Sequence, residues 1–202
     1  VIAFSYCSSD GRKGVYLLRR EGGGEEGIRV KDAEVVFFDD EKSLIEAAFK
    51  LISSYPLVVT FNGDNFDLPY LYNRALKLGI PRESVPIDWS PKAEYATLRK
   101  GLHLDLYKFF NNRSMRVYAF GNKYREGRTL DEISVALLGK GKIQRDVAIG
   151  SMSYAKLAEY SLRDAELTYE LTAFGNDLVM NLIILMMRIS KLPLEDLVRH
   201  NI

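Results

Sequence analysis

The segment LVVTFN, residues 57–62, constrains the fold more than any other stretch of this chain. It is a short, continuously apolar run, which is typical of a buried strand in a parallel arrangement. Gly63 ends the run, and a helix is predicted from about Asn65 to Gly79, because a glycine at that point can end a helix. A buried strand that passes directly into a helix favours an α/β fold.

The remaining pattern surrounds this strand with further strands and helices. β-branched and aromatic runs predict three earlier strands, at residues 1–8, 14–20 and 33–39. We expect these strands to form a meander, with Asp10-Gly11 as a hairpin turn and a polar loop at 21–27. Apolar residues at helical spacing predict helices at 40–56, 128–139 and 153–191. The predicted fold class is α/β, with helices on the faces of a mixed sheet.

Local signals also mark where several elements begin. The segment GLHLDLYKFF, residues 101–110, predicts a strand that runs into a helix. Thr129 is followed three residues later by Glu132, which is the pattern of a capping box at a helix start. Ser153 precedes the last long helical segment and is predicted to cap it.

Composition limits the classes of protein to which this chain can belong. Its 202 residues are enough for a buried core, and its net charge of +1 means that any nucleic-acid binding must rely on local cations. Cys7 is the only cysteine, which excludes an intramolecular disulfide and a cysteine-rich zinc site. No signal peptide opens the chain, and the apolar run 182–187 is too short to span a bilayer. We expect an intracellular protein with no membrane partner. The chain starts at Val1 within a strand-like sequence, and we expect it to be a piece of a longer protein.

Asp67 is the first candidate for a catalytic residue. It lies just past the buried strand and within the first turn of the predicted helix. Open α/β sheets bind ligands at the carboxyl ends of their strands, so this carboxylate should face a crevice. Carboxylate oxygens suit Mg²⁺ or Mn²⁺, and cleavage of a phosphodiester by two such ions about 4 Å apart needs several carboxylates.

Tyr160 and Asp164 form a second candidate pair. They are four residues apart on a predicted helix, so they project from the same face about one turn from each other. That spacing lets a phenol orient water at a carboxylate-bound metal. The alternative is structural, with Tyr160 in the core and Asp164 paired with Arg163 or Arg74.

The two patterns together resemble a known family. TFNGDNFDLPYL (60–71) and YSLRD (160–164) resemble the second and third exonuclease motifs of archaeal family B DNA polymerases. The segments between these two motifs follow one another as in that family, and the resemblance covers essentially the whole chain. It implies an RNase H-like (DnaQ-like exonuclease) domain. It also implies 3′→5′ proofreading, the removal of a misincorporated nucleotide from a frayed primer end.

The resemblance also implies catalytic roles for individual residues. Asp67 would act through water on the second of two Mg²⁺ or Mn²⁺ ions. Asp164 would be a direct ligand of the ion on the nucleophile side, and Tyr160 would position the attacking water.

Three residues around Asp67 match positions that bind DNA in that family. Asn62, Asn65 and Phe66 would grip the last nucleotides of the single-stranded 3′ end. Stacking of Phe66 on a base would contribute about 1–3 kcal/mol. The alternative for Phe66 is a core position beneath the site.

The chain departs from the family in its first motif. That motif is an Asp-x-Glu on the strand before the one that Val1 begins, and no such pair in a strand-like context occurs here. Asp39-x-Glu41 has the spacing but opens a predicted helix, so we reject it. Two metal ligands are then missing, and we expect the two-metal site to be incomplete and the fragment inactive or weak.

The absent strand also has a structural consequence. It is expected to be central, between the meander and the strand that ends at Asn62. Its absence leaves two exposed edges, which invite pairing with another chain. We therefore expect self-association, a rearranged sheet or a segment repositioned into the gap.

Several polar residues near these motifs have open interpretations. Asp105 ends a strand near the proposed crevice, and either structural hydrogen bonding or a role behind the metal ligands fits it. His103 and His200 lack ligand spacing and are predicted to be ordinary side chains. Three cations flank a glycine-rich turn and either touch phosphate or form a solvated turn: Lys140, Lys142 and Arg145.

The chain is divided into an exonuclease domain at 1–192 and the start of a connection to a polymerase body at 193–202. The apolar residues at 182–187 are expected to form a core face or the surface where that body docks. Expected partners are a single-stranded primer 3′ end and the remainder of a polymerase chain. The competing hypothesis is a catalytically inactive exonuclease-like module that docks DNA or a polymerase subunit. A free-standing DnaQ-like nuclease is weaker, because it also needs the missing strand.

Overall fold

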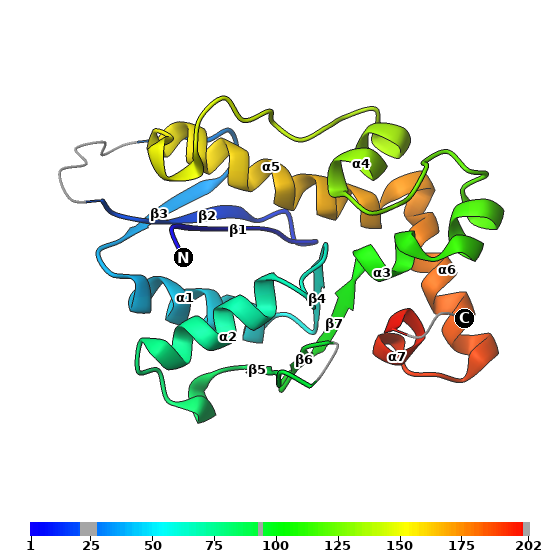
Figure 1. Ribbon diagram of the computed structural model, residues 1–202, viewed down its shortest axis with the longest axis horizontal. Helices are drawn as coiled ribbons and strands as arrows, with labels where there is room; N and C mark the ends of the chain where they lie inside the picture. Colours follow the sequence, from blue (N-terminus) through cyan, green and yellow to red (C-terminus); the bar gives the residue numbers. More distant parts are fainter. Residues whose placement is uncertain (21–27, 93–94, 200–202) are drawn as a thin grey trace.

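The computed structural model describes residues 1–20, 28–92 and 95–199 and confirms the α/β class (Figure 1). The predicted loop at 21–27 lies outside these residues. The first sheet contains β1 (Ala3–Cys7), β2 (Lys13–Leu18) and β3 (Glu34–Phe38). β1 and β2 are antiparallel, but β2 and β3 are parallel, so the predicted meander is wrong. Parallel neighbours need a connection of about a dozen residues or more, and residues 19–33 are long enough for one.

The other strands form two further small sheets instead of extending the first. β4 (Leu57–Thr60) is parallel to β7 (Leu102–Asp105), and β5 (Ile87–Asp88) is antiparallel to β6 (Thr97–Leu98). One mixed sheet was expected, and the described strands are split among three. Among these strands, β1 pairs only with β2 and β4 pairs only with β7. Each therefore keeps one unpaired edge within the described part of the chain.

Helices cover both sides of the first sheet. The α-helices are α1 (Glu41–Ser54), α2 (Asp67–Lys77), α3 (Leu106–Asn111), α4 (Leu130–Leu138), α5 (Tyr154–Thr172), α6 (Phe174–Ser190) and α7 (Leu194–Arg199). Short 3₁₀ turns are η1 (Arg82–Ser84) and η3 (Ile149–Ser151), and η2 (Met115–Ala119) is a π-helix. α5 lies along one face of β1 and β2, while α1 and α2 lie on the opposite side (Figure 1).

Local chemistry explains most of the helix starts. Side chains cap four helices: Asp40 for α1, Asp105 for α3, Thr129 for α4 and Ser153 for α5. The predicted capping box is half formed, because the Glu132 carboxylate accepts from the backbone N–H groups of 126–128 instead of from Thr129. α2 begins at Asp67, later than predicted, and has no side-chain cap. Gly79, with φ +72°, follows its last turn as expected.

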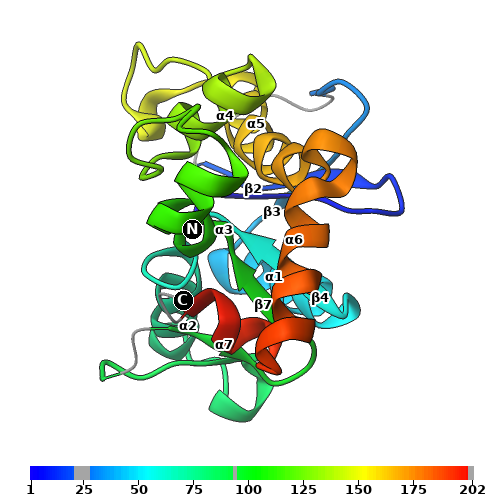
Figure 2. The same ribbon diagram turned by 90° about the vertical axis from the view of Figure 1, so that its right-hand side faces the viewer.

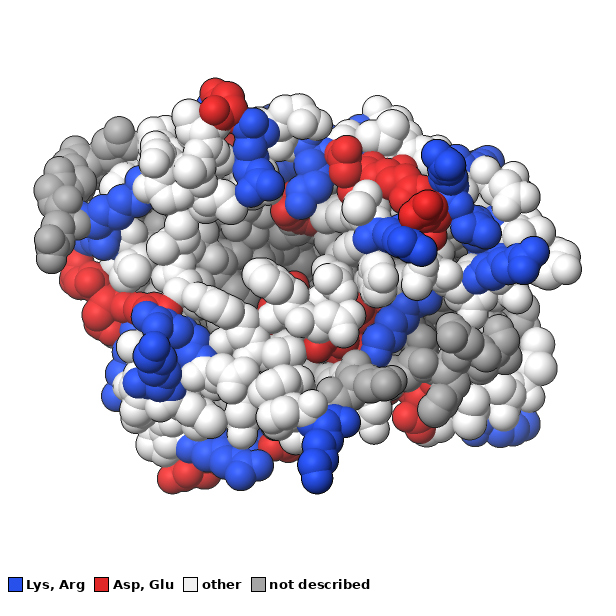
Figure 3. Space-filling model, viewed as in Figure 1, with Lys and Arg blue, Asp and Glu red and all other residues white. Residues whose placement is uncertain are grey.

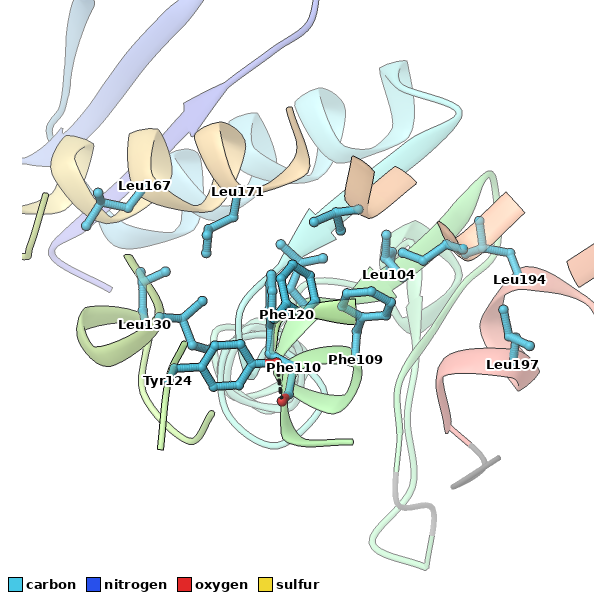
Figure 4. Packing of buried hydrophobic residues seen from close by; sticks show 14 residues of the cluster. Leu104, Phe109, Phe110, Phe120, Tyr124, Leu130, Leu167, Leu171, Leu194 and Leu197 are labelled. Atoms are coloured by element: carbon cyan, nitrogen blue, oxygen red, sulfur yellow. Dashed lines mark hydrogen bonds between the residues drawn. The ribbon is translucent and has the colours of Figure 1, made fainter. Parts of the chain in front are cut away.

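The largest core cluster joins the two parts of the molecule that carry the candidate site. Leu104 of β7 and Phe110 of α3 pack in the same cluster as Leu167 and Leu171 of α5 (Figure 4). α7 also packs into this cluster through Leu194 and Leu197. The boundary at residues 192 and 193 stays a prediction. The cluster fixes α5 relative to β7, and therefore fixes Asp164 in the middle of α5 relative to Asp105 at the end of β7.

A sharp turn separates the last two long helices. α5 and α6 are bent by 67°, and Gly175, Asn176 and Asp177 at the turn all have positive φ. Figure 2 shows α6 running past β4 and β7 toward α7. No single helix in the described residues is long and apolar enough to cross a membrane; α5 and α6 meet the length and composition criteria only as this bent pair.

Candidate active site

The loop that follows β4 is held in shape by a carboxylate from the neighbouring strand. Asp105 is buried, caps α3, and accepts the backbone N–H groups of Asn62 (2.7 Å) and Asp64 (3.1 Å). Asn62 has φ +67°, and a Cβ added to Gly63 would lie 2.2 Å from the Thr60 hydroxyl oxygen. The loop therefore turns tightly against its own strand. These contacts support structural hydrogen bonding for Asp105 over a role behind the metal ligands.

A buried polar network surrounds Asp64. Its carboxylate is 3.2 Å from His103 Nδ1 and 3.0 Å from Lys108 Nζ, and it accepts the Ala96 backbone N–H at 2.9 Å. The His103 contact is close, although its geometry falls short of a hydrogen bond. Burial alone would raise the pKa of Asp64, but His103, the backbone donor and Lys108 lower it to about 2. The buried negative charge of Asp64 is therefore fully compensated by nearby cations and a hydrogen-bond donor.

His103 has a structural role that the sequence analysis missed. Its ring is buried in β7, and Nε2 lies 2.8 Å from the Thr60 hydroxyl oxygen on β4. With Asp64 on its other nitrogen, His103 links β4, β7 and the loop after β4. No spacing in the sequence indicates this role, because both partners are about forty residues away. His200 lies outside the described residues.

Asp67 has the opposite electrostatic environment. It is the first residue of α2, on the same loop as Asp64. Desolvation by the surrounding protein raises the pKa of Asp67 to about 6, and repulsion by Asp105 and Asp164 adds to the effect. The residue itself is exposed to solvent, so water moderates the desolvation. Asp164 is 97 positions away in the sequence, but its charge is among those that raise the pKa of Asp67.

Asp164 and Tyr160 lie one turn apart on α5, as predicted. Asp164 pairs with Lys142 Nζ at 2.7 Å through Oδ2, whereas Oδ1 is buried without a hydrogen-bond partner in the described residues. Burial raises the pKa of Asp164 even though Lys142 opposes the shift. The structural alternative named two other cations, Arg163 and Arg74. They bind the Gly141 carbonyl and Glu41 instead.

Cations from the loop after α4 also cover Tyr160. Lys142 Nζ lies 5.8 Å and the Arg145 guanidinium carbon 6.0 Å from the centre of the half-buried ring. The glycine-rich turn that carries them therefore reaches Tyr160 and Asp164. Lys142 is paired there, whereas Arg145 is exposed, so the choice between phosphate contact and a solvated turn stays open for Arg145. Lys140 points elsewhere and pairs with Glu170.

The predicted DNA-binding side chains lie around Asp67. Phe66 is 65% exposed, which excludes the core alternative, and its ring stacks on Tyr70 with centroids 6.2 Å apart. Asn65 donates through Nδ2 to the side-chain oxygen of Asn62 at 2.8 Å. Figure 3 shows a hollow between the α5 side and the α2 side of the molecule, with acidic atoms inside it.

The donor chemistry fits a divalent metal, but the number of donors does not complete a site. Asp164 offers a buried oxygen without a donor, and Asp67 is destabilised by like charge, so a cation would relieve both. Oxygen ligands of this kind suit Mg²⁺ or Mn²⁺. However, no group of three or more His, Cys, Asp or Glu side chains in the described residues could hold a metal ion. The rejected Glu41 pairs with Arg74.

The comparisons with known proteins all indicate the same family. Residues 24–119 match the family described as DNA polymerase family B, exonuclease domain. The whole chain is 49% identical to part of DNA polymerase 1 of Aeropyrum pernix and 46% identical to part of DNA polymerase 1 of Saccharolobus solfataricus. A DNA polymerase of Pyrococcus glycovorans is 28% identical over 85% of this chain. The chain covers 21%, 23% and 21% of these three relatives, which is about a fifth of their length.

Proposed function

Because the chain belongs to the family B DNA polymerases, as part of their exonuclease domain, we propose that it supplies most of a 3′→5′ proofreading site. The substrate would be the single-stranded 3′ end of a primer, and the reaction would be hydrolysis of its last phosphodiester bond. The observation that carries this proposal is the Asp164 carboxylate, one turn from Tyr160 on α5, which keeps a buried oxygen without a hydrogen-bond partner in the described residues. A buried carboxylate oxygen without a donor is costly, and a bound cation would offset that cost.

The residues of α5 would act on the attacking water. The Tyr160 phenol lies one turn from Asp164, where it can hold a water molecule by hydrogen bonding and fix its approach to phosphorus. Asp164 would contribute the buried oxygen that has no donor, and Asp67 would contribute through water from the opposite wall. Bound Mg²⁺ or Mn²⁺ supplies the lowered pKa of the water and the charge stabilisation that this reaction needs.

The α2 side of the hollow would hold the substrate strand. Phe66 presents a largely exposed ring, which can stack on a terminal base for about 1–3 kcal/mol. Asn62 and Asn65 are tied to each other and offer amide groups beside it. This grip needs an unpaired strand, since the bases of a duplex are already stacked.

The missing metal ligands would come from the rest of the polypeptide. The unpaired edges of β1 and β4 are suited to an added strand, and such a strand could carry the Asp-x-Glu that the described residues lack. The remainder of a polymerase chain is therefore a proposed partner, and self-association through the same edges is the alternative. We also propose an intracellular location, in keeping with a replication polymerase.

A second candidate function has its own supporting observation. Lys142 already neutralises Asp164, and the described residues provide too few metal ligands. A module of this kind would bind DNA or a polymerase subunit without hydrolysing it. Metal-dependent hydrolysis separates the two functions.

The test is hydrolysis of a 5′-labelled, single-stranded oligonucleotide in Mn²⁺ by the full-length gene product and by the 202-residue chain. We expect the full-length protein to shorten the strand from its 3′ end and Asp164→Ala to lose about 10²–10⁴-fold in rate. The isolated chain should be much slower. Asp146→Ala is the matched control, because Asp146 pairs with Lys156 on the surface. Equal rates for Asp164→Ala and the control would contradict the catalytic role, and an inactive full-length protein that binds DNA would favour the second function.

A further inference from the structure

A basic segment with an exposed aromatic residue lies outside the candidate active site. Residues 111–128 contain five cations and one carboxylate, although the whole chain has a net charge of only +1. The carboxylate, Glu126, pairs with Arg128. Three exposed cations of this segment have no carboxylate partner in the described residues: Arg113, Lys123 and Arg125. Figure 3 shows Lys and Arg side chains gathered at this end of the molecule.

Tyr118 is the most unusual member of this segment. It is 87% exposed, more than any other large hydrophobic residue in the described chain, and it lies on the π-helix η2. π-helical turns are rare and frequently occur at functional sites. An aromatic ring displayed so openly contributes nothing to the core. We call Arg113, Tyr118, Lys123 and Arg125 the η2 surface.

The segment is held rigidly enough to present these side chains in a fixed arrangement. Phe120 and Tyr124 are buried on either side of Lys123, and the Tyr124 hydroxyl donates to the Phe110 carbonyl (Figure 4). Arg116 donates to the Arg125 carbonyl and ties η2 to the following loop. The η2 surface is therefore preorganised.

The η2 surface also has a defined position relative to the candidate site. α3 connects the two, with Asp105 at its first end and the basic segment at its other end. Six helical residues span about 9 Å, so a strand of a few nucleotides would reach from the hollow to the η2 surface.

We propose that the η2 surface is a second binding site for single-stranded nucleic acid, separate from the grip at Phe66. Arg113, Lys123 and Arg125 bind backbone phosphates, and Tyr118 stacks on an unpaired base. The combination of cations with a free aromatic face fits a single strand better than a duplex, whose bases are already stacked, or an acidic peptide, which has no bases. The proposal does not depend on hydrolysis at the carboxylates.

The test measures binding of fluorescein-labelled oligothymidylate by anisotropy in EDTA, where metal-dependent hydrolysis cannot occur. We expect Tyr118→Ala to raise the dissociation constant by about 5- to 150-fold. The triple variant Arg113→Ala, Lys123→Ala, Arg125→Ala should reduce the slope of log affinity against log salt by about 2, because each phosphate contact on a single strand contributes about 0.7. A matched control removes three exposed lysines from the α1 and α2 side: Lys42, Lys50 and Lys77. It should leave the slope nearly unchanged.

A second readout covers the full-length gene product, which can bind DNA elsewhere. An oligonucleotide with a photoreactive 5-iodouracil base should crosslink to the peptide that contains Tyr118, as located by mass spectrometry. Unchanged affinity for Tyr118→Ala would overturn the proposal, and so would the absence of a crosslink to the Tyr118 peptide in the wild-type protein. So would equal salt slopes for the two triple variants, or equally tight binding of duplex DNA or polyglutamate. Because hydrolysis is assayed separately in Mn²⁺, failure of either proposal can be recognised on its own.

Discussion

Two carboxylates three residues apart in one loop have opposite environments. Asp64 is buried among His103, Lys108 and a backbone donor, and its pKa falls to about 2. Asp67 is exposed, and desolvation by the surrounding protein together with two other carboxylates raises its pKa to about 6. The first arrangement stabilises the folded chain and leaves no coordination free. The second costs stability and leaves oxygen atoms available, which is the usual sign of a functional acid.

The comparison also explains how a poorly compensated site can exist in a stable fold. The loop is fixed by contacts that do not involve Asp67, namely the Asp105 carboxylate and the Thr60–His103–Asp64 chain. These contacts hold the start of α2 in place, although the charges of Asp105 and Asp164 disfavour the ionised form of Asp67. Strain of this kind is maintained by well-satisfied surroundings.

The largest effect on stability should come from removing the Asp64 carboxylate. Asp64→Ala leaves the Ala96 N–H and the cationic groups of the network without their acceptor, and we expect a loss of about 3–5 kcal/mol in the free energy of unfolding. Urea denaturation would measure it. Asp64→Asn keeps the shape and one acceptor and should cost less. A loss below 1 kcal/mol for Asp64→Ala would mean that the network does not hold the loop.

Removing the charge of Asp67 should have the opposite effect on stability. At pH 7 Asp67→Asn removes a repelled charge, and we expect a gain of about 1 kcal/mol, because solvent screening limits it. In wild type, Asp64 contributes stability above about pH 4 that is lost toward pH 2. Asp67 makes the chain less stable as the pH rises from about 4 to about 6, because its folded pKa lies above its unfolded one.

Urea denaturation from pH 2 to pH 8 in EDTA checks this sign. Asp67→Asn should reduce the decline above pH 4 and keep the acid loss below pH 4; Asp105 and Asp164, whose pKa values burial also raises, keep the rest of the decline. A variant with the same decline as the wild type would place the main titrating group elsewhere.

A smaller effect should appear in metal binding. Lys142→Ala removes the cation that occupies Asp164, and we expect tighter Mn²⁺ binding by about 2- to 5-fold, the equivalent of a partly exposed ion pair. Isothermal titration with Mn²⁺ would measure it. Lys140→Ala, which breaks the neighbouring pair with Glu170, serves as the control. Weaker Mn²⁺ binding by Lys142→Ala would show that the lysine organises the carboxylate for the metal.

The smallest effect on stability is expected at the edge of the hollow. Phe66→Ala should change the free energy of unfolding by less than about 0.5 kcal/mol, because the ring is mostly exposed. Leu68→Ala, only two residues away but buried, should cost about 2–5 kcal/mol. Thermal melts compare the two directly. A large loss for Phe66→Ala would give the ring a structural role.

Features set by neighbouring residues could be predicted from the sequence. The caps Thr129 and Ser153, the strand before Gly63 and the glycine after α2 all follow from chemistry within a few residues. The spacing of Tyr160 and Asp164 on one helix was also predictable.

Features that depend on distant partners could not be predicted in this way. The β-branched pattern of β3 is the same for a parallel and an antiparallel strand, so its direction could not be read from that pattern. The Lys142–Asp164 pair and the Asp64–His103 contact join residues 22 and 39 positions apart. Nothing in the local pattern distinguishes these side chains from solvated ones. The family resemblance indicated the carboxylates, but not the cation that occupies one of them.

The β4–β7 pairing has a consequence for the order in which the protein is made. The paired strands and the Asp64–His103–Lys108 contacts join residues no later than about 108, and only further support, such as the Glu195 carboxylate on the His103 N–H, comes later. Asp164 follows Asp105 by 59 positions. At about 5–20 residues per second, a ribosome needs about 3–12 seconds to add that length. During this interval a growing chain can complete the loop that carries Asp67 before its opposing carboxylate exists. The repulsive pair is then assembled onto a frame that is already set, and it does not have to form as part of that frame.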